Sequence, residues 1–278
     1  MAEFYKLSHD PLPVRTKAQH FALHKDKGFI VTGAAGGLGS AIVRRLLAEG
    51  ARVAAWDVRK EALDGLRDQL PSAEMRVFVC DLSDQEAIQQ AFEATVSFLG
   101  RLDGAVNNAA VVRRAPSPLD ASWLDWEITS AVNVYAPYEI ARLACKQMIK
   151  EKTPGAIVNV ASEAGKKGHI QSLTYSASKA MLINMTRVMS AAVAPYDINV
   201  NCVCPGSMAT EMLQRAAATI AKLTNSTADN VYPQLVSSQL KRHVQPDEVA
   251  ATISFLLSDD AIAIRGQAIN TDGGDTPY

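Results

Sequence analysis

Short apolar stretches alternate with longer helical patterns along nearly all of this 278-residue chain. The apolar stretches have the length and composition of strands, and they lie at 28–32, 51–57, 75–80, 102–108, 155–162, 198–206 and 266–274. Because they are apolar throughout, both faces of each strand are expected to be buried, and the intervening helices impose parallel pairing through right-handed crossovers. The pattern predicts an α/β fold: a single doubly wound domain with a seven-stranded parallel sheet flanked by helices on both faces.

Two segments do not fit the alternation. Residues 1–27 precede the first strand and contain two prolines, so we expect an N-terminal arm, packed either on the domain at 28–278 or on a partner subunit. Residues 207–245 follow the sixth strand and are rich in Ala, Thr, Ser and Asn. A long insertion after the carboxyl end of a strand often covers a ligand, and we expect this one to form a substrate loop.

The composition excludes several classes of partner. The net charge is −1, which gives no field for attracting nucleic acid or an anionic membrane. No apolar run approaches the ~20 residues that span a bilayer, and residues 1–27 lack the apolar core of a secretory signal. The four scattered cysteines are expected to be reduced and buried, and no metal site is predicted. We expect a cytoplasmic protein.

The turn "TGAAGGLG" (32–39) follows the first strand and opens a helix. Glycines at such a position let the backbone turn tightly and let a pyrophosphate approach the helix N-terminus. Gly33, Gly37 and Gly39, with Leu38, are therefore predicted to bind a dinucleotide, although a tight structural turn is the alternative.

Asp57 ends the second strand, where a carboxylate accepts hydrogen bonds from the adenosine ribose and repels the 2′-phosphate of NADP. We therefore expect NAD. Arg59 and Lys60 keep the alternative open, since a nearby basic residue can hold that phosphate.

Polar residues also end the third and fourth strands. Asp81 and Leu82 are placed to cover the adenine, while a helix cap, the alternative, suits Ser83 or Asp84 better. Asn108, in "NNAA" (107–110), is expected to bond to backbone groups of the glycine turn.

Taken together, "TGAAGGLG", "NNAA", "NVAS", "YSASK" and "PGSMAT" occur in the order typical of the short-chain dehydrogenase/reductase family, which the chain resembles over roughly residues 27–274. One departure is "NNAA", where the family commonly has Asn-Asn-Ala-Gly. The resemblance implies a Rossmann-type fold, NAD(P)-dependent alcohol–ketone chemistry, and a homotetramer built through the long helices expected near 130–151 and 174–194.

The resemblance also implies a catalytic tetrad of Asn133, Ser162, Tyr175 and Lys179. In these roles Ser162 stabilises charge on the substrate oxygen, Tyr175 transfers a proton to or from it, and Asn133 holds a water that connects Lys179 to solvent. Lys179 also holds the cofactor ribose. In "PGSMAT" (205–210), Pro205, Gly206 and Thr210 are implied to meet the nicotinamide, and ordinary helix capping is the alternative.

Tyr175 and Lys179 are four residues apart, so on a helix they share a face. At ~5 Å and an effective dielectric of ~20, the lysine would stabilise a tyrosinate by about 3 kcal/mol, roughly two pK units. We therefore expect Tyr175 to titrate near pH ~8 beside an oxidised nicotinamide.

Positions beside these motifs are candidates for the substrate pocket: Val112, Arg113, Arg114, Glu163, Ala164, His169, Met208 and Met212. The two arginines either bind an anionic substrate or form a solvated pair. The leading hypothesis is an NAD-dependent enzyme that interconverts a small secondary alcohol and a ketone. The alternatives are an NADPH-dependent ketone reductase and a catalytically silent dinucleotide-binding scaffold.

Overall fold

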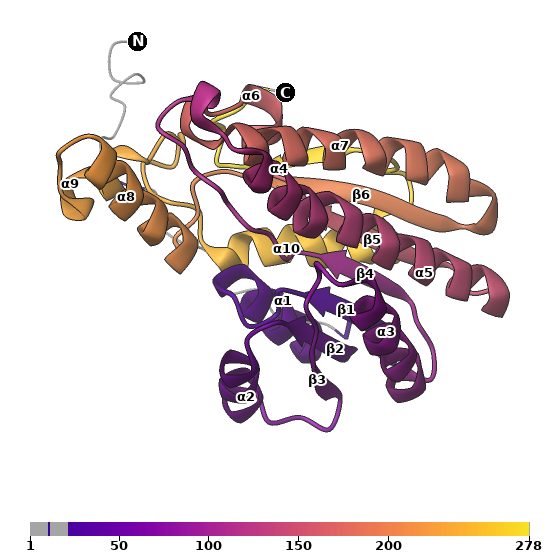
Figure 1. The fold of residues 1–278 in the computed structure, drawn as a ribbon. Helices are drawn as coiled ribbons and strands as arrows, with labels where there is room; N and C mark the ends of the chain where they lie inside the picture. Colours follow the sequence, from indigo (N-terminus) through magenta and orange to yellow (C-terminus); the bar gives the residue numbers. More distant parts are fainter. Residues whose placement is uncertain (1–10, 12–21, 278) are drawn as a thin grey trace, which may run out of the picture.

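The computed structural model describes residue 11 and residues 22–277, and it has the predicted architecture (Figure 1). All seven expected strands form one parallel sheet in the order β3-β2-β1-β4-β5-β6-β7. Their bounds are β1 Gly28–Thr32, β2 Arg52–Asp57, β3 Met75–Val79, β4 Gly104–Asn107, β5 Gly155–Val160, β6 Ile198–Pro205 and β7 Ala268–Thr271. The strand order reverses between β1 and β4, and open sheets of this kind bind ligands at the carboxyl ends of the strands there.

Helices cover both faces of the sheet. Their bounds are α1 Gly37–Ala48, α2 Lys60–Gln69, α3 Gln85–Leu99, α4 Trp123–Ser130, α5 Ala136–Glu151, α6 Ala164–Lys167, α7 Leu173–Val193, α8 Glu211–Leu223, α9 Ala228–Gln234 and α10 Pro246–Leu257. Adjacent residues of a strand point to opposite faces. Ile30 of β1 accordingly belongs to the core under α3 and α5, whereas Val31 belongs to the core under α1, α2 and α10. The four cysteines are free and buried, as predicted.

The helix expected over 130–151 is interrupted. α4 ends at Ser130, a π-helical turn covers Ala131–Tyr135, and α5 begins at Ala136. Apolar periodicity does not reveal such a turn, because it adds a residue without changing the composition. The turn is relevant to function because it contains Asn133.

The insertion at 207–245 is more ordered than its composition suggested. It contains α8 and α9, which lie side by side at one edge of the molecule, away from the sheet (Figure 1). A small apolar cluster of its own, centred on Ala217, Ala221 and Val231, joins the two helices.

Residues 1–10 and 12–21 of the predicted arm lie outside the described residues. Near its end, His24 is fully buried, and its Nε2 lies 3.1 Å from Ser254 Oγ of α10. The last residues before β1 therefore pack on the domain. Within residues 22–277, no helix combines the length and apolarity that a membrane crossing requires.

Candidate active site

The glycine turn after β1 has no room for side chains at three of its glycines. Gly33 has a φ of +61°, and a Cβ there would lie 2.8 Å from Ala109 Cα. A Cβ on Gly39 would lie 2.0 Å from the Gly33 carbonyl oxygen, and one on Gly37 would meet Thr210 Cγ2 at 3.1 Å. The glycines therefore let the turn pack closely against its neighbours, while Gly37, at the start of α1, is exposed. A tight turn that opens a helix suits the close approach of a pyrophosphate.

Asn108 fixes the turn as predicted. Its Nδ2 donates to the carbonyl oxygens of Thr32, at 2.9 Å, and Gly33, at 3.1 Å. The Thr32 hydroxyl in turn accepts from the backbone N–H groups of Asn108 and Ala109. The ends of β1 and β4 are thus joined directly beneath the turn.

Asp57 lies at the carboxyl end of β2, with its side chain buried beside the turn. Its Oδ2 accepts from the Ala35 N–H at 3.1 Å, and its Oδ1 accepts from Arg59 Nε, also at 3.1 Å. This bond raises the pKa of the Arg59 guanidinium. The carboxylate and the guanidinium therefore face the position expected for an adenosine ribose as an ion pair.

Asp81 follows β3 and is exposed, accepting from the N–H and hydroxyl of Ser83. Leu82 beside it is half-buried. The cap of α3 is Asp84, which accepts from the N–H groups of Glu86 and Ala87, as the sequence indicated. Asp81 therefore has no capping role.

Three members of the expected tetrad lie together. Ser162 follows β5, and its hydroxyl oxygen accepts from the Ala164 N–H at 3.1 Å. Tyr175 is in the first turn of α7, where the Ser162 hydroxyl acts to lower the pKa of its phenol. Lys179, one turn further along α7, is buried; its Nζ donates to the Val160 carbonyl at 2.7 Å and lies 5.6 Å from the Tyr175 ring centroid. These contacts link the end of β5 to one face of α7.

The expected lowering of the Tyr175 pKa by Lys179 is wrong for this arrangement. Burial raises the pKa of Tyr175, and the opposing influences come from the Ser162 hydrogen bond and the charge of Arg114. Burial also lowers the pKa of Lys179 to about 8. The Lys179 ammonium group is directed at the Val160 carbonyl. Loss of solvation is the largest influence on the pKa of both Tyr175 and Lys179.

Asn133 uses its amide to position the loop after β4. Its Oδ1 accepts from the Val111 N–H and its Nδ2 donates to the Val111 carbonyl, both at 2.9 Å. Nδ2 also donates to Ser178 Oγ at 3.1 Å, which joins the π-helical turn to α7. The water relay through Asn133 remains a prediction.

The "PGSMAT" segment lies at the same edge of the sheet. Pro205 ends β6, and a Cβ on Gly206 would lie 2.8 Å from Asp272 Cβ. Thr210 is the N-terminal cap residue of α8, but its side chain makes no capping hydrogen bond. Its methyl group packs instead against the glycine turn, so the start of the insertion borders the predicted cofactor site.

The two arginines after β4 have different surroundings. Arg113 is exposed, and its Nε pairs with Asp125 Oδ1 at 2.7 Å. Arg114 is half-buried, as is Val112.

The two methionines also differ. Met208 is partly buried against the core and forms an isolated β-bridge with Val244, whereas Met212 is exposed on α8. Ala164 is buried at the start of α6.

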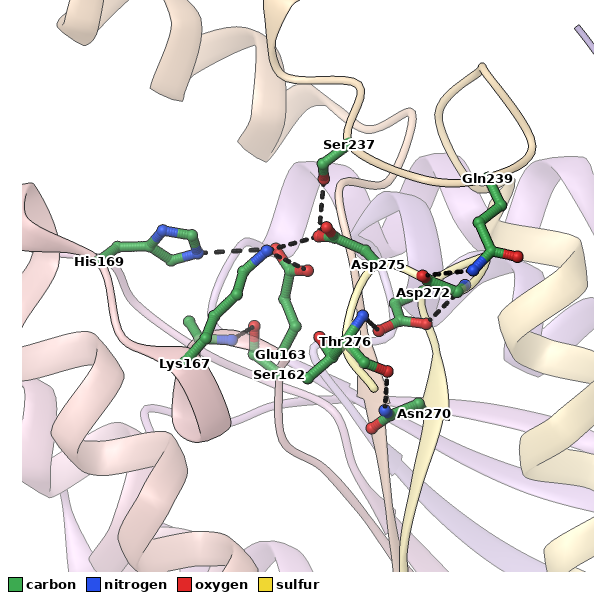
Figure 2. Close-up of polar contacts among 12 residues, drawn as sticks. Ser162, Glu163, Lys167, His169, Ser237, Gln239, Asn270, Asp272, Asp275 and Thr276 are labelled. Atoms are coloured by element: carbon green, nitrogen blue, oxygen red, sulfur yellow. Dashed lines mark hydrogen bonds and ion pairs between the residues drawn. The ribbon is translucent and has the colours of Figure 1, made fainter. Parts of the chain in front are cut away.

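A polar network behind Ser162 joins three distant segments (Figure 2). Glu163, which is buried, lies 3.1 Å from Lys167 Nζ and 3.6 Å from His169 Nε2. Asp275, in the C-terminal tail (272–277), accepts from Lys167 at 2.5 Å and from Ser237 of the insertion at 2.6 Å. The network thus ties the tail to the segment that carries Ser162.

The pKa values of two acids in this network are shifted in opposite directions. Burial raises the pKa of Glu163, and a hydrogen bond from Glu163 lowers the pKa of Asp275. We missed Lys167, Ser237 and Asp275 from the sequence. The available signal was "TDGGD" (271–275), two acids directly after the last strand and therefore at the ligand-binding edge.

Comparison with known proteins gives consistent matches along the chain. A family model described as enoyl-(acyl carrier protein) reductase matches residues 33–276. D-threitol dehydrogenase of Mycolicibacterium smegmatis is 34% identical over 268 residues, which cover 94% of this chain and 99% of that protein. Meso-2,3-butanediol dehydrogenase of Serratia marcescens is 34% identical, over 90% of this chain and 95% of that protein.

A solved structure has the same fold. NAD⁺-bound xylitol dehydrogenase superposes with a TM-score of 0.84 at 30% identity, covering 90% of this chain and 99% of that one.

Proposed function

The chain belongs to the short-chain dehydrogenase/reductase family of NAD(P)-dependent enzymes, and we propose that it uses NAD to interconvert a small secondary alcohol and a ketone, with Tyr175 as the acid and base. The observation that supports this proposal best is the grouping of Ser162, Tyr175 and Lys179 at the carboxyl edge of the sheet, with Lys179 Nζ 5.6 Å from the Tyr175 ring centroid and bonded to the Val160 carbonyl at the end of β5. Threitol, butanediol and xylitol, named for the relatives, are all small alcohols.

Each residue has a defined task in this proposal. The Tyr175 phenol exchanges a proton with the substrate oxygen, and the Ser162 hydroxyl orients that oxygen and stabilises its developing charge. Lys179 holds a ribose hydroxyl, and Asn133 keeps the loop after β4 in place through Val111. When bound, the nicotinamide supplies hydride chemistry.

The bare backbone of the glycine turn and Asp57 would hold the dinucleotide, together with Asp81, Leu82, Pro205, Gly206 and Thr210. The preference for NAD rests on Asp57. Its buried carboxylate repels a 2′-phosphate, and it already engages Arg59, the nearest cation that would attract one. NADPH-dependent reduction is the second candidate, because Arg59 is half exposed and is able to turn toward a phosphate.

Turnover is tested by absorbance at 340 nm with small polyols and hydroxy acids. Tyr175 is also predicted to contact the cofactor, together with Lys179. Tyr175→Phe should abolish turnover while leaving NADH binding within about threefold, because the variant loses the phenol oxygen that transfers the proton but keeps the ring and Lys179. Unchanged turnover in this variant would refute the assignment. For the cofactor, NADH should bind at least about tenfold more tightly than NADPH; the reverse order would support the reductase.

The helices α5 and α7 carry apolar side chains on their outer surfaces. Tyr138 of α5 is 48% exposed, and Met181 and Val188 of α7 are 47% and 63% exposed. Such a surface supports assembly through these two helices, and we propose a homotetramer, located in the cytoplasm. A monomer in light scattering would contradict this assembly.

A further inference from the structure

The guanidinium of Arg114 is held near the candidate active site without an acidic partner. Among the residues that the structure describes, it makes no hydrogen bond or ion pair, and its one electrostatic partner is Tyr175. Arg113 beside it has an ordinary surface ion pair with Asp125. A half-buried cation that lacks an anion is costly unless a ligand supplies one.

The backbone on both sides of Arg114 fixes its position. Val111 is held at its N–H and carbonyl by Asn133. The N–H of Ala115 donates to the carbonyl of Gln171 at 3.2 Å, four residues before Tyr175. The segment therefore crosses from the π-helical turn to the start of α7. Because this segment passes beside the start of α7, the positive charge of Arg114 opposes the rise in the pKa of Tyr175.

The acidic side chains around Ser162 already have basic partners. Glu163 and Asp275 both lie within ion-pair distance of Lys167, and Glu163 also lies 3.6 Å from His169 Nε2 (Figure 2). Arg59, at the cofactor end, is paired with Asp57. Lys179, the other cation beside Tyr175, donates to the Val160 carbonyl. Arg114 thus differs from it in having no hydrogen-bond acceptor among the described residues.

We propose that Arg114 binds a carboxylate of the substrate, so that the enzyme acts on a hydroxy acid and its keto acid rather than on a neutral polyol. This inference rests on the proposed alcohol–ketone chemistry. The planar fork of a guanidinium matches a carboxylate with two parallel hydrogen bonds. A single guanidinium suits a monoanion better than a phosphate, which carries about −1.5 to −2.

The test compares polyols with aldonates of the same carbon number: threitol with threonate, xylitol with xylonate, and sorbitol with gluconate. For at least one pair, the wild type should have the higher kcat/KM on the aldonate. Arg114→Gln should lower that value about 10- to 100-fold and change the value for the polyol by no more than about threefold. Arg114→Lys should retain part of the preference because it keeps the charge.

Arg113→Gln is the matched control, since it removes a charge from the same loop at a surface ion pair; it should change neither value by more than about threefold. Two results would overturn the proposal: no aldonate preferred over its polyol, or equal losses on both in Arg114→Gln. If neither the polyols nor the aldonates are turned over, the proposed function fails. Calorimetric binding of xylonate to the NADH complex then still tests whether Arg114 binds a carboxylate. Equal affinity in the wild type and Arg114→Gln would exclude it.

Discussion

The glycine turn after β1 and the C-terminal tail after β7 end at the same edge of the sheet, but they are held in place in opposite ways. The turn depends on backbone contacts and on side chains that are missing, above all at Gly39. The tail depends on charged side chains that reach across the fold, as between Asp275 and Lys167. The proposed cofactor side is thus fixed by close packing, and the proposed substrate side by a polar network.

The largest effect is expected for Gly39→Ala. The added Cβ would meet backbone atoms at 2.0 and 2.8 Å, and backbone cannot move aside as the end of a side chain can. We expect a loss of about 3 kcal/mol in the free energy of unfolding, with weakened NADH binding. Urea unfolding and fluorescence titration of NADH measure the two effects.

Gly65→Ala is the control, because nothing lies within 4 Å of a Cβ there and the residue is inside α2. It should stabilise the protein by about 0.5–1 kcal/mol, as alanine does when it replaces a glycine within a helix. If Gly39→Ala and Gly65→Ala had equal effects on the free energy of unfolding, the description of the turn as close-packed would be wrong.

A smaller effect is expected for Asp275→Ala, which removes the acceptor shared by Lys167 and Ser237. The loss of charged hydrogen bonds should cost about 2 kcal/mol of stability. Because the network lies behind Ser162, KM for the alcohol should rise while the Kd for NADH stays nearly constant. Steady-state kinetics and NADH titration separate the two quantities.

Asp260→Ala, at an exposed position, serves as the reference and should leave both quantities unchanged. A larger change in the Kd for NADH than in the KM for the alcohol would show that the two sides are not independently held.

The smallest effect concerns pH. Burial raises the pKa of Glu163 above its ordinary value of 4.5, so the folded state binds more protons than the unfolded state above that pH. The contribution of this group is therefore fully present below pH 4.5 and is lost as pH rises through its folded pKa. Glu163→Gln stays neutral, so the wild type should lose stability relative to this variant between pH 5 and pH 8.

Urea unfolding midpoints at pH 5, 6.5 and 8 measure this difference, with Glu61→Gln on the exposed surface of α2 as the reference. Parallel pH curves for the wild type and Glu163→Gln would show that folding does not raise the pKa of Glu163.

The sequence predicted the glycine turn better than the C-terminal tail, because local patterns encode the turn whereas contacts between distant residues hold the tail. Continuous apolar runs revealed the strands, and the role of Asn108 at the turn followed from its place at the end of β4. The bond between Lys167 and Asp275 spans 108 residues, and no local pattern encodes it. The pKa of Tyr175 was mispredicted because spacing along a helix does not say where an ammonium group points or how dry it is.

The π-helical turn at Ala131–Tyr135 has a consequence for how this chain can change by insertion and deletion. Each residue of an α-helix advances the chain by about 100° around the axis. Deleting one residue here would let α4 continue into α5 as one regular helix. The deletion would rotate α4 relative to α5 about the helix axis and move Asn133 away from Val111. At this position, a gain or loss of one residue shifts the phase of the helix and separates α7 from the loop after β4.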